Sequence, residues 1–406
     1  MPKLNLKFLL IPIFICLSIG LKAGINLSEK GEISVLTFGP YQGELYSAFG
    51  HSGIRVYDPA TNINWIYHYG VFNFKQKNFF WNFARGKMRY SIGLADFNKY
   101  VEYYTNDNRS VTELVLNLTP EEKQMVFDFL QENYQPENRE YNYNYVYDNC
   151  ATKIKEVINK AVPGQINFTN EYVEEGVTIR DLMDRYLKYQ PWGDWIIDIG
   201  LGSQIDKVAN TDEYLFLPDY VTEAFKNAQI KRGESSPPLV KEINSLYNSK
   251  PETFENGVFT PFNTFVLLFF VVGFFTNRDF KTMKRTKWID VLLFTFVGIF
   301  GWWCTFLWIG TDHLSKMNYN LLWAIPVFIP IVFFLNVKKY RKISATFFKI
   351  IGIWYIILLV IWGALPQPLH SAMIPLVITM VLRSFYINFD LNKKIRTEAR
   401  LGSKAP

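Results

Sequence analysis

Cysteine and histidine are scarce in this chain, which has three cysteines and four histidines in 406 residues. Cys16 lies in an apolar N-terminal stretch and Cys304 in the apolar C-terminal third, so Cys150 is the only cysteine of the polar part. A lone thiol forms no disulfide within that part, which excludes a disulfide framework. Neither CxxC nor HExxH occurs, which argues against a zinc site of those kinds.

Nucleotide-binding and nucleic-acid-binding motifs are also missing. No glycine-rich loop of the phosphate-binding type is present. The polar part has no run of Lys and Arg interleaved with aromatic residues, so the net charge of +6 does not indicate nucleic-acid binding. We therefore expect no nucleic-acid partner, no metal and no cofactor.

The mean hydropathy of +0.00 averages a polar first part and a very apolar C-terminal third. Residues 1–23 have the form of a secretory signal peptide, with Lys3 and Lys7 before an apolar stretch and Ala23 at the cleavage site. An uncleaved anchor is the alternative. Residues 24–256 are then long enough for one exported domain with its own core.

Five apolar segments predict an all-α transmembrane domain over residues 257–389. They are 258–275, 288–309, 321–337, 350–365 and 372–389. Lys and Arg gather in the first and third loops between these segments and in the tail, residues 390–406. By the positive-inside rule those parts are cytoplasmic, which places the domain before residue 257 in the periplasm.

The polar domain shows signals of both strands and helices. Thr119, Pro120 and Glu122 predict a helix start with a capping box, and that helix should run to about residue 133. Another helix is expected to begin at Cys150, and a third over 178–186. The stretch from Ser235 towards the membrane is interpreted as a linker. Strands are predicted over 33–38, 53–57, 65–69, 89–94 and 110–116.

The surroundings of Cys150 favour a nucleophile. Asp148 or Asn149 is expected to cap the following helix, which places Cys150 near its first turn. The partial positive charge of a helix N-terminus favours thiolate over thiol, and its free N–H groups can hold an oxyanion. We therefore expect a thiolate at neutral pH. The alternative is a small buried residue without a chemical role.

Two histidines could assist this thiol. His51 stands in the sequence Phe-Gly-His-Ser-Gly, where glycines leave room around the ring, and it could act as general base. His68 lies on the next predicted strand and could orient the His51 ring. The alternatives are a surface histidine in a turn and a half-exposed strand residue.

The outer loops of the membrane part carry further polar residues. Asp312 and His313 follow the second apolar segment, and His370 lies in the other outer loop. The predicted topology puts them on the same side of the membrane as Cys150. Asp312 and His313 are candidates for binding a lipid headgroup or substrate, and the alternative is that they only anchor the membrane edge.

The order of His first and Cys later, with an Asn-Cys-Ala-Thr box opening a helix, resembles the circularly permuted papain-like enzymes, such as lecithin:retinol acyltransferase. Nearly the whole chain also resembles the Lnb family of bacterial lipoprotein N-acyltransferases. That resemblance rests on the segments around His51 and Cys150, on Tyr-Gly-Val-Phe-Asn-Phe at 69–74, on Asn-Phe-Phe at 78–80 and on Asn-Leu-Leu-Trp at 320–323.

The resemblance implies an α+β, permuted papain-like periplasmic domain followed by five transmembrane helices in the bacterial inner membrane. It implies transfer of a fatty acyl group from a phospholipid donor to the α-amine of a diacylglyceryl-cysteine lipoprotein. Cys150 would be the nucleophile and His51 its base, while the role of His68 stays open. Asn149, beside the thiol, is a further candidate for substrate binding.

Two other classes of function remain compatible with the same residues. A membrane-anchored cysteine hydrolase or amidase of the cell envelope would use the same Cys–His pair. A non-enzymatic envelope sensor or assembly factor would need neither residue. A fatty acyl thioester on Cys150 would separate acyl transfer from both.

Overall fold

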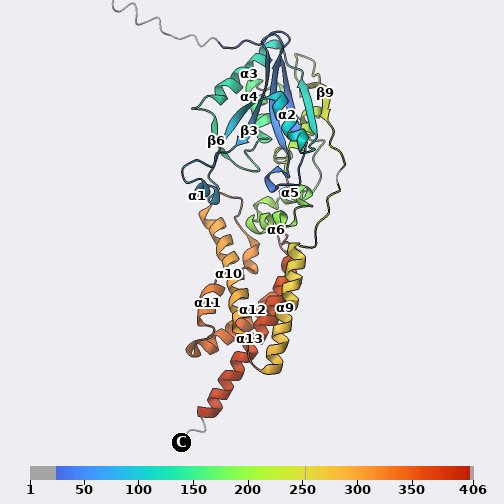
Figure 1. Ribbon diagram of the computed structural model, residues 1–406. Helices are drawn as coiled ribbons and strands as arrows, with labels where there is room; N and C mark the ends of the chain where they lie inside the picture. The colour runs from blue at the N-terminus through green and yellow to red at the C-terminus, as the bar shows by residue number, and fades with distance from the viewer. Residues whose placement is uncertain (1–23, 252, 403–406) are drawn as a thin grey trace, which may run out of the picture.

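The computed structural model describes residues 24–251 and 253–402, and the predicted signal peptide lies outside these residues. Figure 1 shows a sheet-rich domain above a group of long helices. The architecture is thus mixed α and β in the first part and helical in the second. A permuted papain-like order within the first part stays a prediction.

A seven-stranded antiparallel sheet forms the centre of the first domain, in the order β6-β4-β3-β2-β1-β5-β9. All five predicted strands are confirmed. The strands are β1 (Glu32–Phe38), β2 (His51–Asp58), β3 (Ile63–Val71), β4 (Met88–Asp96), β5 (Val111–Leu116), β6 (Glu140–Tyr143) and β9 (Val240–Tyr247), and β7 (Ile166–Asn167) pairs with β8 (Gln229–Ile230) separately.

The interpretation of the stretch after Ser235 as a linker is wrong for β9. This segment pairs with β5 along the edge of the sheet. Its apolar residues Ile243 and Leu246 are exposed, so it lacks the alternating burial by which an internal strand is recognised. β9 therefore joins the sheet through backbone pairing with β5, although its side-chain pattern does not predict a strand.

Helices cover both faces of the sheet. The main core packs α3 (Pro120–Tyr134), α4 (Thr152–Ala161) and α8 (Pro218–Asn227) on one face, and α2 (Phe97–Asn106) lies on the other. The predicted capping box between Thr119 and Glu122 is confirmed at the start of α3. Smaller helices are α1 (Phe79–Ala84), α5 (Ile179–Leu187), α6 (Pro191–Gly200) and α7 (Thr211–Tyr214), and 3-10 turns are η2 (Leu45–Ser47) and η3 (Ser203–Ile205).

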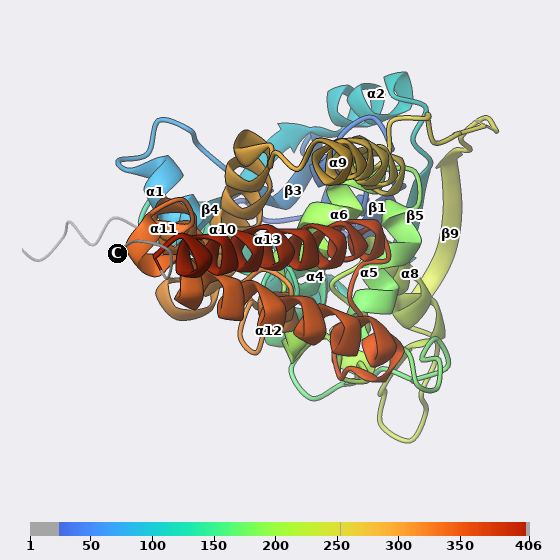
Figure 2. The ribbon, with the colours of Figure 1, turned by 90° about the horizontal axis from the view of Figure 1, so that it is seen from below.

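Four helices among the described residues are long and apolar enough to cross a membrane. They are α9 (Pro261–Thr282), α10 (Lys287–Gly310), α12 (Arg341–Val360) and α13 (Met373–Gly402). Figure 2 shows α13 running between α9 and α12, and its contacts with both agree. Shorter pieces are η4 (Tyr319–Leu322), α11 (Phe328–Phe334), η5 (Lys338–Tyr340) and η6 (Trp362–Ala364).

The prediction of five regular transmembrane helices is not confirmed, because the segment 321–337 is broken into η4 and the seven-residue α11. Pro326 lies between η4 and α11, and because it lacks an N–H donor and restricts the residue before it, it disfavours one continuous helix there. The segment still links the two ends of the bundle. The amide of Asn320 bonds the Asp198 carbonyl at the domain end, and Arg285 bonds Asn336 at the far end.

Buried ion pairs join the helices at the end away from the sheet domain. Arg383 of α13 lies 3.0 Å from Asp279 of α9 and 2.5 Å from Asp290 of α10. Arg285 lies 3.3 Å from Asp290 and 3.4 Å from Asp390. Charges inside a membrane domain need such partners, so this network ties α9, α10 and α13 together.

Candidate active site

One cavity of about 500 Å³ lies where the sheet domain meets the helices. Its wall includes Cys150, His51 at the end of the sheet, and Trp303 and Leu307 at the domain end of α10. Most of the other lining residues are apolar or aromatic: Tyr46, Phe49, Phe72, Phe83, Tyr90, Tyr143, Tyr145, Met183, Ile196, Ile197, Leu201, Phe216 and Pro218. The cavity therefore connects the predicted nucleophile with a membrane helix.

Asn149 fixes the turn that carries Cys150. Its side-chain oxygen accepts hydrogen bonds from the N–H groups of Ala151 (2.9 Å) and Thr152 (3.0 Å). Its amide nitrogen donates to the carbonyls of Phe216 (2.7 Å) and Tyr145 (3.0 Å). The helix begins at Thr152 with Ala151 at its N-cap position, two residues later than predicted, but Asn149 does accept from N–H groups at its start. Asn149 also lines the cavity, but its polar atoms are already engaged, and its predicted role in substrate binding stays a prediction.

Cys150 is partly buried just before α4. Burial raises the pKa of its thiol to about 11, although backbone N–H groups of Ser52, Cys150 and Ala151 and the charge of Arg109 act in the opposite direction. The expectation of a thiolate at neutral pH is therefore wrong, because desolvation outweighs the helix start. The thiol needs a base that removes its proton during attack.

Alkylation of Cys150 by iodoacetamide should rise about tenfold per pH unit between pH 7 and 10, because the thiolate fraction grows in that way below the pKa. The measurement uses the full-length protein with Cys16→Ala and Cys304→Ala, which leaves one thiol. A plateau in the labelling rate below about pH 8.5, the free thiol value, would contradict the buried, protonated state.

His51 begins β2 and lines the same cavity. Its Nε2 atom is buried and has no hydrogen-bond partner among the described residues. Burial, followed by the neighbouring His68 and Arg109, holds the pKa of His51 well below its usual value. The ring is therefore neutral at pH 7 and able to accept a proton.

Gly70 lies beside both His51 and Cys150. A Cβ atom at this position would lie 3.8 Å from the Cβ of Cys150 and 4.0 Å from the Cε1 of His51. Gly70 also has a φ of +92°, which favours glycine. The absence of a side chain here leaves the space between thiol and imidazole open.

His68 lies behind His51 and does not line the cavity. It faces Gly53 across the β2–β3 pair, and its ring centre is 5.6 Å from that of His51 and 4.6 Å from that of Tyr100. Burial lowers the pKa of His68 to about 4. It is thus a neutral neighbour of the His51 ring, and its orienting role stays a prediction.

Sequence reasoning missed Arg109, which is only 4% exposed. Its Nε donates to the Gly39 carbonyl at 2.8 Å, and its guanidinium lies 4.4 Å from the ring centre of Tyr104. Its buried Nη2 atom has no hydrogen-bond partner among the described residues. Its charge lowers the pKa of both Cys150 and His51. Because Arg109 is distant from both along the chain, only the fold reveals this proximity.

Two family models match the chain, the Lnb N-terminal periplasmic domain over residues 29–185 and the Lnb transmembrane domain over residues 253–395. The chain belongs to the Lnb family. These matches make it a membrane protein with a periplasmic domain. No curated protein and no solved structure shows significant similarity to it.

In this Lnb protein, the structure separates the two predicted loop residues. His313 lines the cavity, and its Nε2 lies 3.2 Å from the Phe83 carbonyl. Asp312 is exposed and does not line the cavity, and its backbone N–H donates to the Arg85 carbonyl at 2.8 Å. Substrate binding by either residue stays a prediction, and the cavity favours His313.

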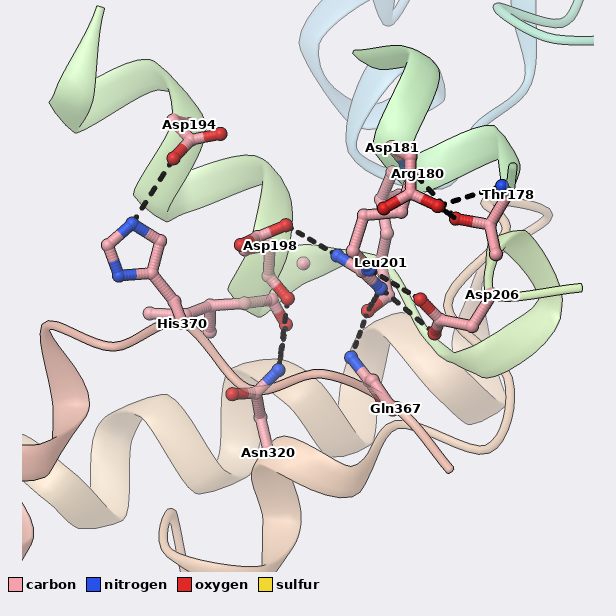
Figure 3. Close-up of polar contacts among 12 residues, drawn as sticks. Thr178, Arg180, Asp181, Asp194, Asp198, Leu201, Asp206, Asn320, Gln367 and His370 are labelled. Atoms are coloured by element: carbon pink, nitrogen blue, oxygen red, sulfur yellow. Dashed lines mark hydrogen bonds and ion pairs between the residues drawn. The ribbon is translucent and has the colours of Figure 1, made fainter. Parts of the chain in front are cut away.

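Helix α6 docks the periplasmic domain of the Lnb protein onto its membrane helices (Figure 3). Arg180 of α5 lies 2.5 Å from Asp198 of α6 and 2.6 Å from Asp206. From the membrane side, Asn320 donates to the Asp198 carbonyl at 3.0 Å, and Gln367 donates to the Leu201 carbonyl at 2.9 Å. These contacts hold the α6 wall of the cavity.

Asp194, Asp198 and His370 form a group whose potential metal-ligand atoms lie within 4.8 Å of one another. The Nδ1 atom of His370 accepts from the Ala372 N–H at 3.1 Å, so Nε2 carries the ring proton of the neutral tautomer and donates to Asp194 at 3.2 Å. Arg180 already pairs with Asp198. These hydrogen bonds therefore fit a polar contact between α6 and the loop before α13 better than a metal site.

Asn149→Ala should lower stability by about 1–2 kcal/mol through the lost cap and should also reduce activity, because the turn that carries Cys150 loosens. Thr119→Ala is the matched control, since it removes the cap of α3, away from the cavity. Thermal unfolding and activity are measured on both variants. Equal activity at equal stability loss would contradict a positioning role for Asn149.

Proposed function

We propose that this Lnb protein is a lipoprotein N-acyltransferase. It moves a fatty acyl group from a phospholipid, through a thioester on Cys150, to the α-amine of a diacylglyceryl-cysteine lipoprotein. The observation that carries the proposal is that Cys150, His51 and the α10 residues Trp303 and Leu307 line the same largely apolar cavity.

This cavity suits a substrate that comes from a bilayer. Each methylene group moved from an apolar environment into water costs about 0.8 kcal/mol. An acyl chain that passes along Leu307 and Trp303 towards Cys150 keeps apolar contacts throughout. A soluble domain without these helices would have to extract the whole chain by itself.

In the first half-reaction the Cys150 sulfur attacks the ester carbonyl of the phospholipid. His51 takes the thiol proton as the C–S bond forms. The C–O bond to the glycerol then breaks, and His51 returns the proton to the leaving oxygen, so a lysophospholipid departs. Backbone N–H groups near the sulfur, from Ser52 and Ala151, are candidates for stabilising the oxyanion.

In the second half-reaction the neutral α-amine of the lipoprotein attacks the thioester carbonyl. The C–N bond forms, the C–S bond breaks, and the amine loses one proton by way of His51. That proton returns to the Cys150 sulfur, which restores thiol and neutral imidazole. Aminolysis of a thioester to an amide is energetically favourable, so the reaction requires no further cofactor.

The proposed location is the bacterial inner membrane with the cavity on the periplasmic side. Cationic residues support this orientation, because they gather at the end of the helices away from the sheet domain. They include Arg278, Arg285, Lys338, Arg341 and Lys394.

Mass spectrometry of lipoprotein N-termini tests the proposal in cells with the wild-type protein, with Cys150→Ser, or with neither. N-acylated termini are expected only with the wild type. A hydroxylamine-labile acyl group should also be found on Cys150 of the purified protein. Unchanged N-termini would overturn the transfer reaction, and turnover to free fatty acid would favour a hydrolase instead.

A further inference from the structure

An exposed aromatic surface lies beside the cavity on and next to α1. We name it the aromatic lip and define it as Phe74, Phe80, Trp81 and Phe83. Their exposed fractions are 63%, 78%, 57% and 49%, respectively. So many neighbouring exposed aromatic rings are unusual on a surface that faces only water.

The structure fixes the lip at the domain end of α10, as Figure 1 shows for α1. The ring centre of Trp81 lies 6.3 Å from that of Phe306 on α10. The Arg85 carbonyl after α1 accepts from the backbone of the loop that follows α10. Gly86 packs closely against the same loop, because a Cβ atom at this position would lie 2.9 Å from the backbone nitrogen of His313.

The lip continues the exposed apolar surface of a membrane helix. On α10, Trp302 and Ile309 are 55% and 79% exposed, and Phe306 beside Trp81 is also exposed. A bilayer around α10 covers these residues. The same bilayer surface therefore reaches Trp81, and aromatic residues are favoured at this depth.

The charges around the lip fit phospholipid headgroups. Residues 59–95 contain no Asp or Glu. Lys75, Lys77 and Lys87 are exposed close to the lip. Cations beside an aromatic apolar face are the pattern of a segment that lies in a membrane interface and contacts phosphate groups.

We propose that the aromatic lip inserts into the periplasmic leaflet and forms one side of the entrance by which a phospholipid acyl chain reaches the cavity. Phe83 belongs to both surfaces, since it is exposed on the lip and also lines the cavity. The entrance role rests on the proposed function, whereas insertion of the lip does not.

Photocrosslinking tests insertion without requiring catalysis. The residue Phe80 is replaced by benzoylphenylalanine in the full-length Cys150→Ala protein, reconstituted in vesicles of phosphatidylethanolamine and phosphatidylglycerol. Tyr103, 60% exposed on α2, is the matched control position. We expect a phospholipid adduct at 80 and none at 103. No lipid adduct at 80, equal adducts at both positions, or an adduct only with protein overturns the insertion.

The double variant Phe80→Ser/Trp81→Ser tests the entrance in the otherwise wild-type protein. Acyl transfer from membrane phospholipid should fall about tenfold or more relative to transfer from a soluble short-chain thioester, because two apolar side chains leave the interface. Tyr103→Ser should leave that ratio unchanged. An unchanged ratio for the double variant overturns the entrance role. Lipid adducts at 80 without any acyl transfer by the wild type would refute the proposed function alone.

Discussion

Replacing Cys150 by alanine should reduce acyl transfer to background, and His51→Ala should do nearly the same. Both residues line one cavity, and no other thiol among the described residues does so. Because the thiol pKa is raised to about 11, the sulfur depends on proton removal by a base. We expect losses of at least about a thousandfold for each variant, as for residues that act as one catalytic unit.

The measurement is single-turnover acyl transfer by purified full-length protein in phospholipid vesicles. The double variant Cys150→Ala/His51→Ala should be little worse than either single variant. Cys304→Ala is the matched control, since this buried thiol lies on α10 and does not line the cavity. Wild-type rates in His51→Ala would remove the imidazole from the mechanism.

Arg180→Leu should destabilise the protein by about 3–5 kcal/mol, because it leaves two buried carboxylates without their cation. The side chains of Arg180, Asp198 and Asp206 are 3%, 10% and 4% exposed, respectively. Asp198 belongs to α6, which contributes Ile196 and Ile197 to the cavity wall. Acyl transfer should therefore be lost as the protein is destabilised, although Arg180 does not line the cavity.

Arg185→Leu is a control on the same helix. Arg185 pairs with Glu174, and their side chains are 37% and 51% exposed, so the loss should stay below about 1 kcal/mol. The triple variant Arg180→Leu/Asp198→Leu/Asp206→Leu removes all three charges and should recover part of the stability. Thermal unfolding in detergent and acyl transfer give the two readouts. Equal losses in Arg180→Leu and Arg185→Leu would contradict the importance of the buried pairs.

Most of the sheet could be predicted because its strands carry their own signals. The segments around Val35, Ile54 and Tyr67 combine β-branched and aromatic residues with flanking turns, and Thr119 marks a helix start by a short-range motif. β9 was missed because its pairing with β5 depends on a distant partner. The break in the segment 321–337 was missed because length and hydropathy do not register the effect of Pro326.

The candidate site was predictable in its composition but not in its electrostatics. Cys150 and His51 were identified because scarce residue types stood in distinctive local sequences. The burial that raises the thiol pKa is a property of the folded cavity. The argument from the helix start therefore overestimated the fraction of Cys150 that is thiolate at neutral pH. Arg109 and the bridging position of Gly70 depend on contacts between segments far apart in the chain.

Helix α6 lies between residues 185 and 253, in the part of the chain that neither family match covers. Trp195 and Ile199 pack into the core of the membrane helices, whereas Ile197 packs against the core of the sheet domain. A substitution on α6 must therefore suit two cores at once. The two halves therefore constrain each other's evolution, because a membrane half taken from another Lnb protein would form the cavity wall only if α6 matched both cores.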